Sequence, residues 1–435
     1  MRPAAADPEK LAGWVIDASE RALQLVADLT DEQMVGPLLP TVNPLIWEIG
    51  HLAWFQEKFV LRAACGHEPI LPFADAVYDS GAIPHDTRWR LDLPTRARTV
   101  EYVRTVAERV AEQVLRPDAL DVVHHFARYT VHHYDTHTEA LTYTRQSLGH
   151  SPPVLPGLTD AEPPEVTSTG PAGGTAGGDV EIAGGSFPLG ARMSDPFVYD
   201  NEKWAHLVEI APFAIARTPV TQAEFAGFVE AGGYTDPRLW SDQGAWLAAT
   251  GATRPLYWRG GPGEWQRRHF DTWVDLEPNV AMSHVSWWEA DAYCRWAGRR
   301  LPTEAEWECA ATGGSRAKPT YPWGEDEPTA KTAATDWRSI GPVDVGACQA
   351  GESPAGCRHM IGNVWEWTAS DFVAYPNFER DAYFENSEQF FGSRKVLRGG
   401  AWATRGRYVR SIMRNYFTPD RRDVLGGFRT CAVAE

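Results

Sequence analysis

The segment PDALDVVHHFARYTVHHYDTHTEALTYTRQSL, residues 117–148, decides how the first part of this chain folds. Its apolar residues recur at helical spacing, which predicts one long helix. His133 and His137 are four residues apart, so their rings lie on one helical face, one turn apart, where both can reach a common ion. Three upstream residues continue this face and predict that it points into a helical bundle: Val122, Phe126 and Tyr129.

Three further helices are expected before this one. Asp7, Pro8 and Glu9 supply a cap, a first-turn proline and an acid for the first helix, and Asn43-Pro44 opens the second. Four helices in this order predict an antiparallel four-helix bundle with one long crossover. The expected helices span 7–29, 43–66, 94–114 and 117–148, the crossover spans 66–93, and the bundle domain spans 1–150.

His51 lies in the middle of the second expected helix among apolar side chains, so it can offer a third imidazole across the core. Three inward imidazoles are hard to explain by packing, because each ring carries two nitrogens that need partners. A lone helical histidine is more often structural than a ligand, and histidines are common in this region, so placement rather than composition selects these three. Tyr134 follows His133, so the HExxH motif of zinc proteases is absent. Neutral imidazoles suit zinc, iron or copper, and ligand type alone does not decide between them.

Residues 151–178 are rich in Pro, Gly, Ser and Thr and hold almost no large apolar side chain, which predicts a flexible linker. From 179 to 435 the pattern changes to short strand-like runs, a few capped helices, and Gly- and Trp-rich stretches. This pattern predicts a compact α+β domain with long ordered loops. Three capping boxes, each a hydroxyl residue answered three positions later by Glu, mark helix starts: Thr221 with Glu224, Ser286 with Glu289, and Thr303 with Glu306.

The composition argues against several kinds of partner. The formal net charge of −17 disfavours a nucleic-acid partner, which needs a basic surface. No apolar run approaches the roughly 20 residues that span a bilayer, and residues 1–10 lack the layout of a secretory signal. The six cysteines form no CxxC pair, which predicts a reducing, cytoplasmic location, and we do not expect a disulfide between Cys348 and Cys357.

Certain strings match the motifs of known families: NPLIWEIGHLAWFQEKFVLR (43–62), DAVYDSGAIPHDTRWRL (75–91), HYDTHTE (133–139), ALTYTRQSLG (140–149), WAGRRLPTEAEWE (296–308), GNVWEWT (362–368), VLRGGAWA (396–403) and GGFR (426–429). In these strings the first domain resembles the DinB-like four-helix bundle of the ergothioneine-biosynthesis sulfoxide synthases. The second domain resembles the formylglycine-generating-enzyme (sulfatase-modifying factor) fold, a C-type-lectin-like architecture. The two domain types occur in this order chiefly in that family, and the resemblance covers nearly the whole chain outside the expected linker.

The resemblance implies a non-haem Fe(II) enzyme that uses O2 to join a chalcogen donor to C2 of the imidazole of hercynine, Nα-trimethylhistidine. It implies that His51, His133 and His137 bind the iron and leave three positions on it, so that the reactants meet at one centre. Tyr375, in AYPNF, stands where the family carries YPGF, so its phenol is the candidate catalytic proton donor. The other implied site residues are the donor-binding arginines Arg88, Arg90 and Arg421 and the hercynine-binding residues Asn415 and Tyr416. A guanidinium fork suits a carboxylate, and an ordinary ion pair is the alternative reading of each arginine.

Phe417 departs from the subfamily that uses γ-glutamylcysteine. There an aspartate follows the residue that matches Tyr416, and phenylalanine cannot grip the ammonium of an amino-acid donor. The strings YDNEKWAH (199–206) and FTPDRRDV (417–424) look most like those of selenoneine synthases, so we expect a selenosugar donor. A branch that uses cysteine or γ-glutamylcysteine stays open.

Two other classes compete with this reading. A zinc-dependent thiol transferase is one, because DinB-like bundles with three histidines also do that work, but the fused second domain and Asn415-Tyr416 argue against it. A non-enzymatic binding module is the other, and it leaves three inward histidines without a role. Oxidation of sulfatase cysteines is not expected, because that chemistry needs a late cysteine pair and only Cys431 follows residue 403.

Overall fold

The computed structural model describes residues 7–156, 162–165, 178–240, 244–383 and 386–434. The chain forms two compact units, Met1–Thr159 and Asp160–Glu435, and each is described by itself. Within the expected linker, residues 157–161 and 166–177 lie outside the described residues, so the linker and the expected domain limits stay predictions. All six cysteines are described and all are free thiols, including Cys348 and Cys357. No helix in the described ranges is long and apolar enough to span a bilayer.

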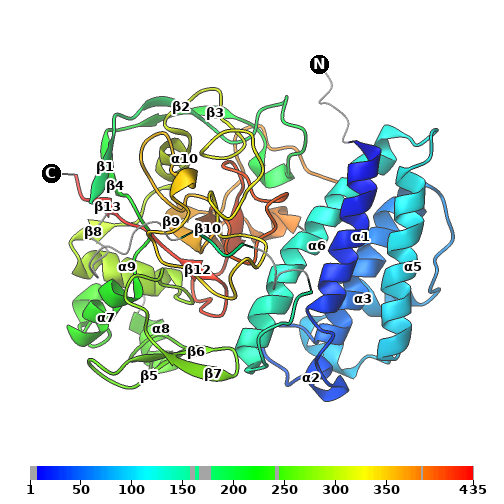
Figure 1. The fold of residues 1–435 in the computed structure, drawn as a ribbon, viewed down its shortest axis with the longest axis horizontal. Helices are drawn as coiled ribbons and strands as arrows, with labels where there is room; N and C mark the ends of the chain where they lie inside the picture. The colour runs from blue at the N-terminus through cyan, green and yellow to red at the C-terminus, as the bar shows by residue number, and fades with distance from the viewer. Residues whose placement is uncertain (1–6, 157–161, 166–177, 241–243, 384–385, 435) are drawn as a thin grey trace. The chain divides into compact units, whose positions relative to one another are not determined.

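The first unit is helical, as the sequence predicts, and its long helices run alongside one another in Figure 1. α1 and α3 each pack against α5 and α6, so these four helices enclose the core of the bundle. α3 is buried on every side, which is typical of a helix at the centre of a core. The elements are α1 Pro8–Gln24, α2 Asp31–Val35, α3 Leu45–Gln56, η1 Glu57–Ala64, α4 Ala74–Tyr78, η2 His85–Arg90, α5 Arg96–Val114 and α6 Asp121–Leu148.

Several helix limits differ from the expected ones. α1 starts as expected, with the Asp7 side chain accepting from the Glu9 amide, but it ends at Gln24 and not near residue 29. The second expected helix is α-helical only to Gln56, and its last turns, Glu57–Ala64, are π-helical. α6 begins at Asp121, about one turn later than expected.

The prediction for Val122 is wrong. Its side chain is 40% exposed, because the buried face at the start of α6 passes through Val123 and Ala127 instead. Phe126 is half-buried, and Tyr129 is buried as expected. The predicted face therefore points into the bundle only from about Tyr129 onward.

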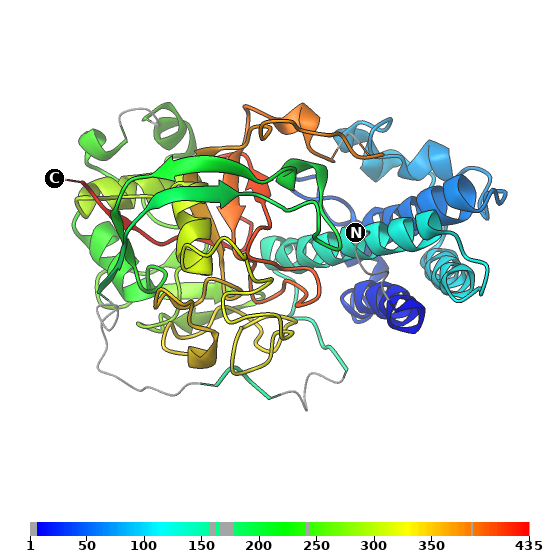
Figure 2. The same ribbon diagram turned by 90° about the horizontal axis from the view of Figure 1, so that it is seen from above.

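The second unit is an α+β fold, as predicted. Its strands form two four-stranded sheets, in the orders β1-β4-β13-β8 and β11-β10-β9-β12, with a two-stranded ribbon β2-β3 and a three-stranded sheet β5-β6-β7. Figure 2 shows the β2-β3 ribbon along one side of this unit. The strands are β1 Asp179–Ile182, β2 Gly185–Leu189, β3 His206–Ile210, β4 Phe213–Ala216, β5 Trp258–Arg259, β6 Gln266–His269, β7 Thr272–Asp275, β8 Arg299–Arg300, β9 Trp365–Asp371, β10 Lys395–Arg398, β11 Asn415–Phe417, β12 Gly426–Gly427 and β13 Cys431–Ala432.

The helices of the second unit begin where the capping boxes predict. All three boxes are formed, each with the hydroxyl accepting from the third amide of its helix and the Glu side chain accepting from the cap amide. The helical elements are α7 Gln222–Glu230, α8 Gly244–Thr250, α9 Trp287–Trp296, α10 Glu304–Thr312, and the short η4 Asp200–Glu202, η5 Pro237–Leu239, η6 Gln349–Gly351 and η8 Glu388–Phe390.

Buried ion pairs join the sequence motifs of the second unit. Glu366, on β9, accepts two hydrogen bonds from Arg429 at 2.6 and 2.7 Å, and one from the indole of Trp307 on α10. Glu308 accepts one hydrogen bond from Arg398 and another from Lys318, and the side chains of Glu308, Arg398, Glu366 and Arg429 are all fully buried. Breaking such a pair leaves an uncompensated charge in the core, so these motif residues hold the fold together.

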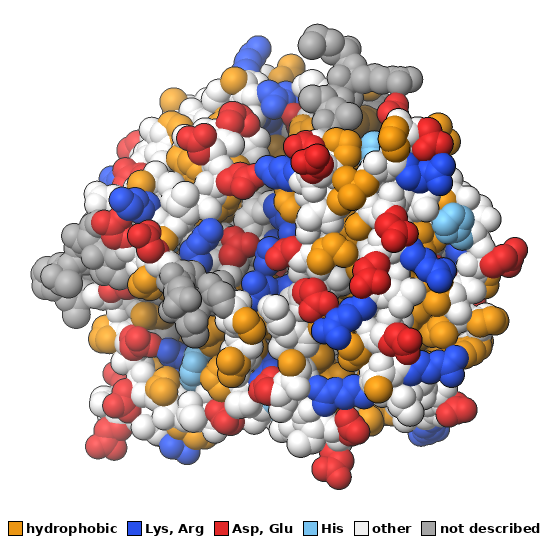
Figure 3. All heavy atoms as spheres, turned by 45° about the vertical axis from the view of Figure 1, so that its right-hand side comes forward, with side chains coloured by type: hydrophobic (Ala, Val, Ile, Leu, Met, Phe, Trp, Pro, Cys, Tyr) orange, Lys and Arg blue, Asp and Glu red, His pale blue; other side chains and the backbone are white. Residues whose placement is uncertain are grey.

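On the face that Figure 3 shows, charged side chains of one sign do not gather into a patch. Acidic and basic side chains are interspersed there with apolar ones.

Candidate metal centre

His51, His133 and His137 come together in the first unit. Their nearest ring nitrogens all lie within 4.8 Å of one another. The ring centroid of His51 is 5.3 Å from each of the other two, which are 4.4 Å apart. His51 comes from α3 and the other two from α6, whose helical period places residues four apart on one face, as the sequence predicts.

Hydrogen bonds fix which nitrogen of His51 and His137 faces the centre. The Nδ1 atom of His51 lies 2.8 Å from the carbonyl oxygen of Tyr78, which only accepts, so Nδ1 carries the proton and Nε2 keeps a lone pair. The Nδ1 atom of His137 contacts the carboxylate of Glu48, with the same consequence. Metal-binding histidines are typically held in this way through their other ring nitrogen.

Stacked aromatic rings hold the planes of two of the imidazoles. Phe55 stacks on His133 with centroids 3.7 Å apart and an interplanar angle of 12°. Trp47 stacks on His51 at 4.9 Å and 7°. Both aromatic residues lie on α3, so one helix orients a ring of its own and a ring of α6.

Burial keeps the imidazoles in the form that binds metals. Burial, followed by the charge of His137, lowers the pKa of His51 to about 3. The same two causes hold the pKa of His133 well below its usual value. Burial opposes ionisation of Glu48, but the charge of His137 and the hydrogen bond to it outweigh burial and lower the pKa of Glu48 to about 2. Two neutral imidazoles and one carboxylate partner are the protonation states that metal binding requires.

The geometry of the three nitrogens fits a metal ion. The Nε2 atoms of His133 and His137 are 3.2 Å apart. A metal–nitrogen distance of about 2.1 Å places two ligands roughly 3.0 Å apart at a right angle and roughly 3.4 Å apart at the tetrahedral angle. Two lone pairs at this separation repel unless a cation or a proton lies between them. The donor set suits iron, zinc or copper equally.

The two predicted donor arginines of the first unit lie on η2 in different settings. The guanidinium of Arg88 is half-buried: its Nη1 donates to Asn43 Oδ1 at 2.6 Å, and its Cζ lies 4.1 Å above the ring of Trp47. Arg90, at the end of η2, is exposed. Neither role is tested by these contacts, so both remain predictions.

The residues predicted to bind hercynine form part of one sheet in the second unit. Asn415, Tyr416 and Phe417 make up the edge strand β11, paired with β10. The ring of Tyr416 stacks on Phe372 at 3.9 Å. The side chain of Asn415 accepts from the amide of Tyr416.

Arg421 and Phe417 also meet in the second unit. The guanidinium of Arg421 lies 5.0 Å above the ring of Phe417 and donates twice to Asp423, both times at 2.7 Å. The phenylalanine therefore provides a cation–π surface for Arg421.

Tyr375 is buried in the core of the second unit. Its hydroxyl donates to Glu304 at 3.0 Å, and Arg414 lies 4.1 Å above its ring. Burial, partly offset by the charge of Arg414, holds the pKa of this phenol well above its usual value. The hydroxyl is thus protonated at neutral pH, and its role as proton donor stays a prediction.

Sequence reasoning missed Glu48, Asn43 and the carbonyl of Tyr78. A usable signal existed for one of them, because Glu48 precedes His51 by three residues and so lies one turn away on the same helix. The link from Glu48 to His137 spans 89 positions and depends on the relative register of α3 and α6. No local pattern reports that register.

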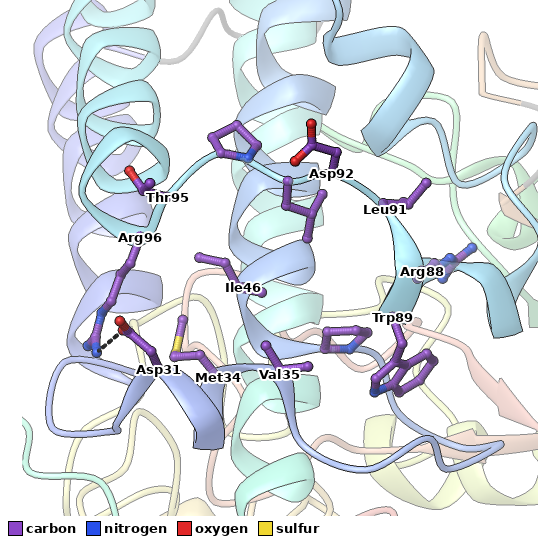
Figure 4. A pocket seen from close by; sticks show the side chains of 13 residues that line it. Asp31, Met34, Val35, Ile46, Arg88, Trp89, Leu91, Asp92, Thr95 and Arg96 are labelled. Carbon is purple, nitrogen blue, oxygen red and sulfur yellow. Dashed lines mark ion pairs between the residues drawn. The ribbon is translucent and has the colours of Figure 1, made fainter.

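A separate pocket of about 360 Å³ opens in the first unit (Figure 4). Met34 and Ile46 supply apolar walls, Asp31 and Arg96 pair at one end, and Arg88 lies at the other. The three histidines do not line this pocket, so it is distinct from the metal centre.

Known proteins share both units. Residues 165–434 match the sulfatase-modifying factor enzyme 1-like domain, and residues 16–139 match the DinB superfamily. The chain is therefore a DinB-type bundle, with a three-histidine centre, followed by a domain of the sulfatase-modifying-factor type.

The chain is 36% identical over 433 residues to the hercynine oxygenase of Mycolicibacterium thermoresistibile, covering 97% of this chain and 94% of that one. It is also 36% identical to the hercynine oxygenase of Mycobacterium tuberculosis, over 97% of this chain and 98% of that one. The formylglycine-generating enzyme of Mycobacterium tuberculosis is 38% identical over 46% of this chain and 76% of its own length. The chain therefore belongs to the hercynine oxygenase family, the ergothioneine-biosynthesis sulfoxide synthases.

Proposed function

We propose that this protein is a non-haem Fe(II)- and O2-dependent synthase that joins selenium or sulfur to C2 of the imidazole of hercynine, with a selenosugar as donor. One observation carries the proposal: a centre of three convergent histidines lies in a chain related over 97% of its length to hercynine oxygenases. Bound iron would supply the redox chemistry with O2.

The protein's own residues hold and shape that centre. His51 and His137 present Nε2 because Tyr78 and Glu48 take their Nδ1 protons. Phe55 and Trp47 fix the ring planes of His133 and His51. An oriented donor set strengthens metal binding and leaves the open positions for reactants.

Hercynine recognition is proposed for Asn415 and Tyr416. Hercynine carries a quaternary ammonium group, and the face of Tyr416 that Phe372 does not cover is the kind of aromatic surface that binds one, at about 0.5–2 kcal/mol per contact. The amide of Asn415 suits the substrate carboxylate.

The donor is proposed from Phe417 and its neighbours. Phe417 offers a ring where a carboxylate would pair with an amino-acid ammonium, and Arg421 lies against that ring. A sugar chalcogenide has no ammonium and loses nothing by this exchange, while its hydroxyls can accept from arginine. Arg90, exposed at the end of η2, is the corresponding donor-side candidate of the first unit.

Reconstitution tests the whole proposal. The purified protein is loaded with Fe(II) without oxygen, then given hercynine, O2 and equal amounts of a 1-selenosugar, cysteine and γ-glutamylcysteine, and the products are identified by mass spectrometry. We expect the selenium adduct to dominate. A dominant sulfur adduct would return the chain to the ergothioneine branch, and no adduct with any donor would refute the reaction.

Alanine variants of the three histidines test the centre itself. His51→Ala, His133→Ala and His137→Ala are each expected to lose most bound iron and all product while the bundle stays folded by circular dichroism. His125, exposed on the same helix α6, provides the matched control in His125→Ala. Metal analysis of the purified protein also separates this proposal from a zinc-dependent thiol transferase, which would retain zinc and need no O2.

A further inference from the structure

A chain of hydrogen bonds connects His137 to an arginine that lies outside the metal centre. His137 Nδ1 contacts Glu48 Oε1, and Glu48 Oε2 accepts from Asn43 Nδ2 at 2.6 Å. Asn43 Oδ1 in turn accepts from Arg88 Nη1 at 2.6 Å. Glu48 is only 4% exposed, so its carboxylate is shielded from water.

The direction of every bond in the chain is determined by its two ends. Arginine only donates, so the oxygen of the Asn43 amide faces Arg88 and its NH2 group faces Glu48. A carboxylate only accepts, so both oxygens of Glu48 require donors, and the second donor is the Nδ1–H of His137. This chain of hydrogen bonds, a relay from Arg88 to His137, therefore admits one tautomer of His137, the one whose Nε2 lone pair faces the other two histidines.

Arg88 is itself held firmly. Its Nη2 donates to the carbonyl oxygens of Ser80 and Ile83, both at 3.3 Å. Its guanidinium also stacks on Trp47, the ring that covers His51. Arg88 thus contacts the supports of two different histidines, one through the amide of Asn43 and one through an aromatic face.

We propose that Arg88 is a positioning residue of the metal centre, acting on His137 through Asn43 and Glu48 and on His51 through Trp47. This role differs from the one implied by the family resemblance, in which Arg88 grips the donor carboxylate. The guanidinium already has hydrogen-bond partners for Nη1 and Nη2, and a rigid fork with those contacts serves orientation. The inference rests on the proposed function only in that His137 binds a metal.

Metal affinity measured without any substrate distinguishes the two roles. The metal-free protein is titrated without oxygen with Fe(II), and with Co(II), whose visible spectrum reports ligand geometry. Arg88→Met is expected to weaken binding about tenfold and to alter the Co(II) spectrum, and Glu48→Gln to weaken it about ten- to a hundredfold. A residue that served only the donor would leave both readouts unchanged.

Two matched variants control for general damage. Arg90 is the neighbouring exposed arginine on the same short helix, and Arg90→Met is expected to bind metal within twofold of the wild type. Glu57 is a fully buried carboxylate in η1, which continues directly from α3, the helix of Glu48. Its partners are Tyr102 and the amide of Ile70. Glu57→Gln is expected to lower the melting temperature without changing the Co(II) spectrum.

Each outcome either supports the inference or overturns it. If Arg88→Met does not fold, Asn43→Leu is tested in its place, because this substitution interrupts the same relay at its middle. Wild-type affinity and spectrum in a folded Arg88→Met, or in its Asn43→Leu replacement, would overturn the inference. An equal spectral change in Glu57→Gln would overturn it as well. The wild-type titration separates this inference from the proposed function. If the wild type binds no metal, the proposed function fails and the inference with it; if the wild type binds metal and the variants match it, only the inference fails.

Discussion

Lowering the pH from 7 to 5 is expected to weaken the metal-free first unit by about 2 kcal/mol through His51 alone. The pKa of this imidazole is about 3 in the folded protein and 6.5 in its ordinary state. Between these values the unfolded chain binds a proton that the folded chain does not, so stability falls as the pH falls below 6.5. At pH 5 the unfolded form is almost fully protonated, and the difference in proton binding corresponds to roughly 2 kcal/mol.

Two neighbouring groups, His133 and Glu48, also change the stability as the pH falls, each in its own pH range. The pKa of His133 is also lowered from 6.5. Its contribution to stability is therefore also lost as the pH falls below 6.5. Glu48 has a pKa of about 2 against 4.5, so the stability that its carboxylate contributes is present above 4.5 and is lost only below that value. A bound metal opposes the loss, because protons and metal compete for the same nitrogens.

Hydrogen exchange measures the effect inside the first unit. The free energy of opening is obtained from peptides covering α3 and α6 of the full chain at pH 7 and pH 5, corrected for the intrinsic pH dependence of exchange. His51→Gln is expected to reduce the loss by about 2 kcal/mol, and His125→Gln, on an exposed position, to leave it unchanged. A loss below about 1 kcal/mol in the wild type, or an equal loss in His51→Gln, would refute the reasoning.

Three other outcomes are expected. Phe417→Asp raises the affinity for γ-glutamylcysteine relative to the selenosugar by about ten- to a hundredfold, since a charge-assisted hydrogen bond contributes about 1.5–3 kcal/mol; an unchanged product ratio with both donors present would count against this donor assignment. Arg429→Met leaves Glu366 buried without its cation and costs the second unit about 3–5 kcal/mol, measured by urea unfolding; a cost below 1 kcal/mol would show that the pair is dispensable. Tyr375→Phe lowers the rate of product formation at least tenfold with iron content unchanged, whereas an unchanged rate would restrict Tyr375 to its hydrogen bond with Glu304.

Features that depend on local spacing could be predicted from the sequence. The three capping boxes are formed because a hydroxyl and a carboxylate three residues apart need only one helical turn to meet. The convergence of His133 and His137 follows from the same periodicity, and His51 joins them from α3, a helix that is buried on every side. Local periodicity thus predicts the helices of the bundle and the pairing of His133 with His137.

Features that depend on the contact between distant segments could not be predicted. The residues of the π-helical turns Glu57–Ala64 are ones that α-helices also carry, so their composition does not reveal the wider winding. Val122 follows the helical period from His133 but faces solvent, because the buried face at that end is set by what α6 packs against. The contact of Glu48 with His137 requires both the register and the rotation of two helices. These quantities are properties of the folded core.

The arginines show why a matching motif is a better guide to the fold than to a residue's role. Arg398 and Arg429 both lie in strings that identify the family, and both are fully buried partners of glutamates in the core. Arg88 lies in another such string, and its contacts with Asn43 and Trp47 lead to the supports of His137 and His51. Arg421 divides its guanidinium between a carboxylate and a ring. Of the three arginines that the resemblance assigns to the donor, Arg90 is the one whose side chain is exposed, so it is the first to examine as a donor ligand.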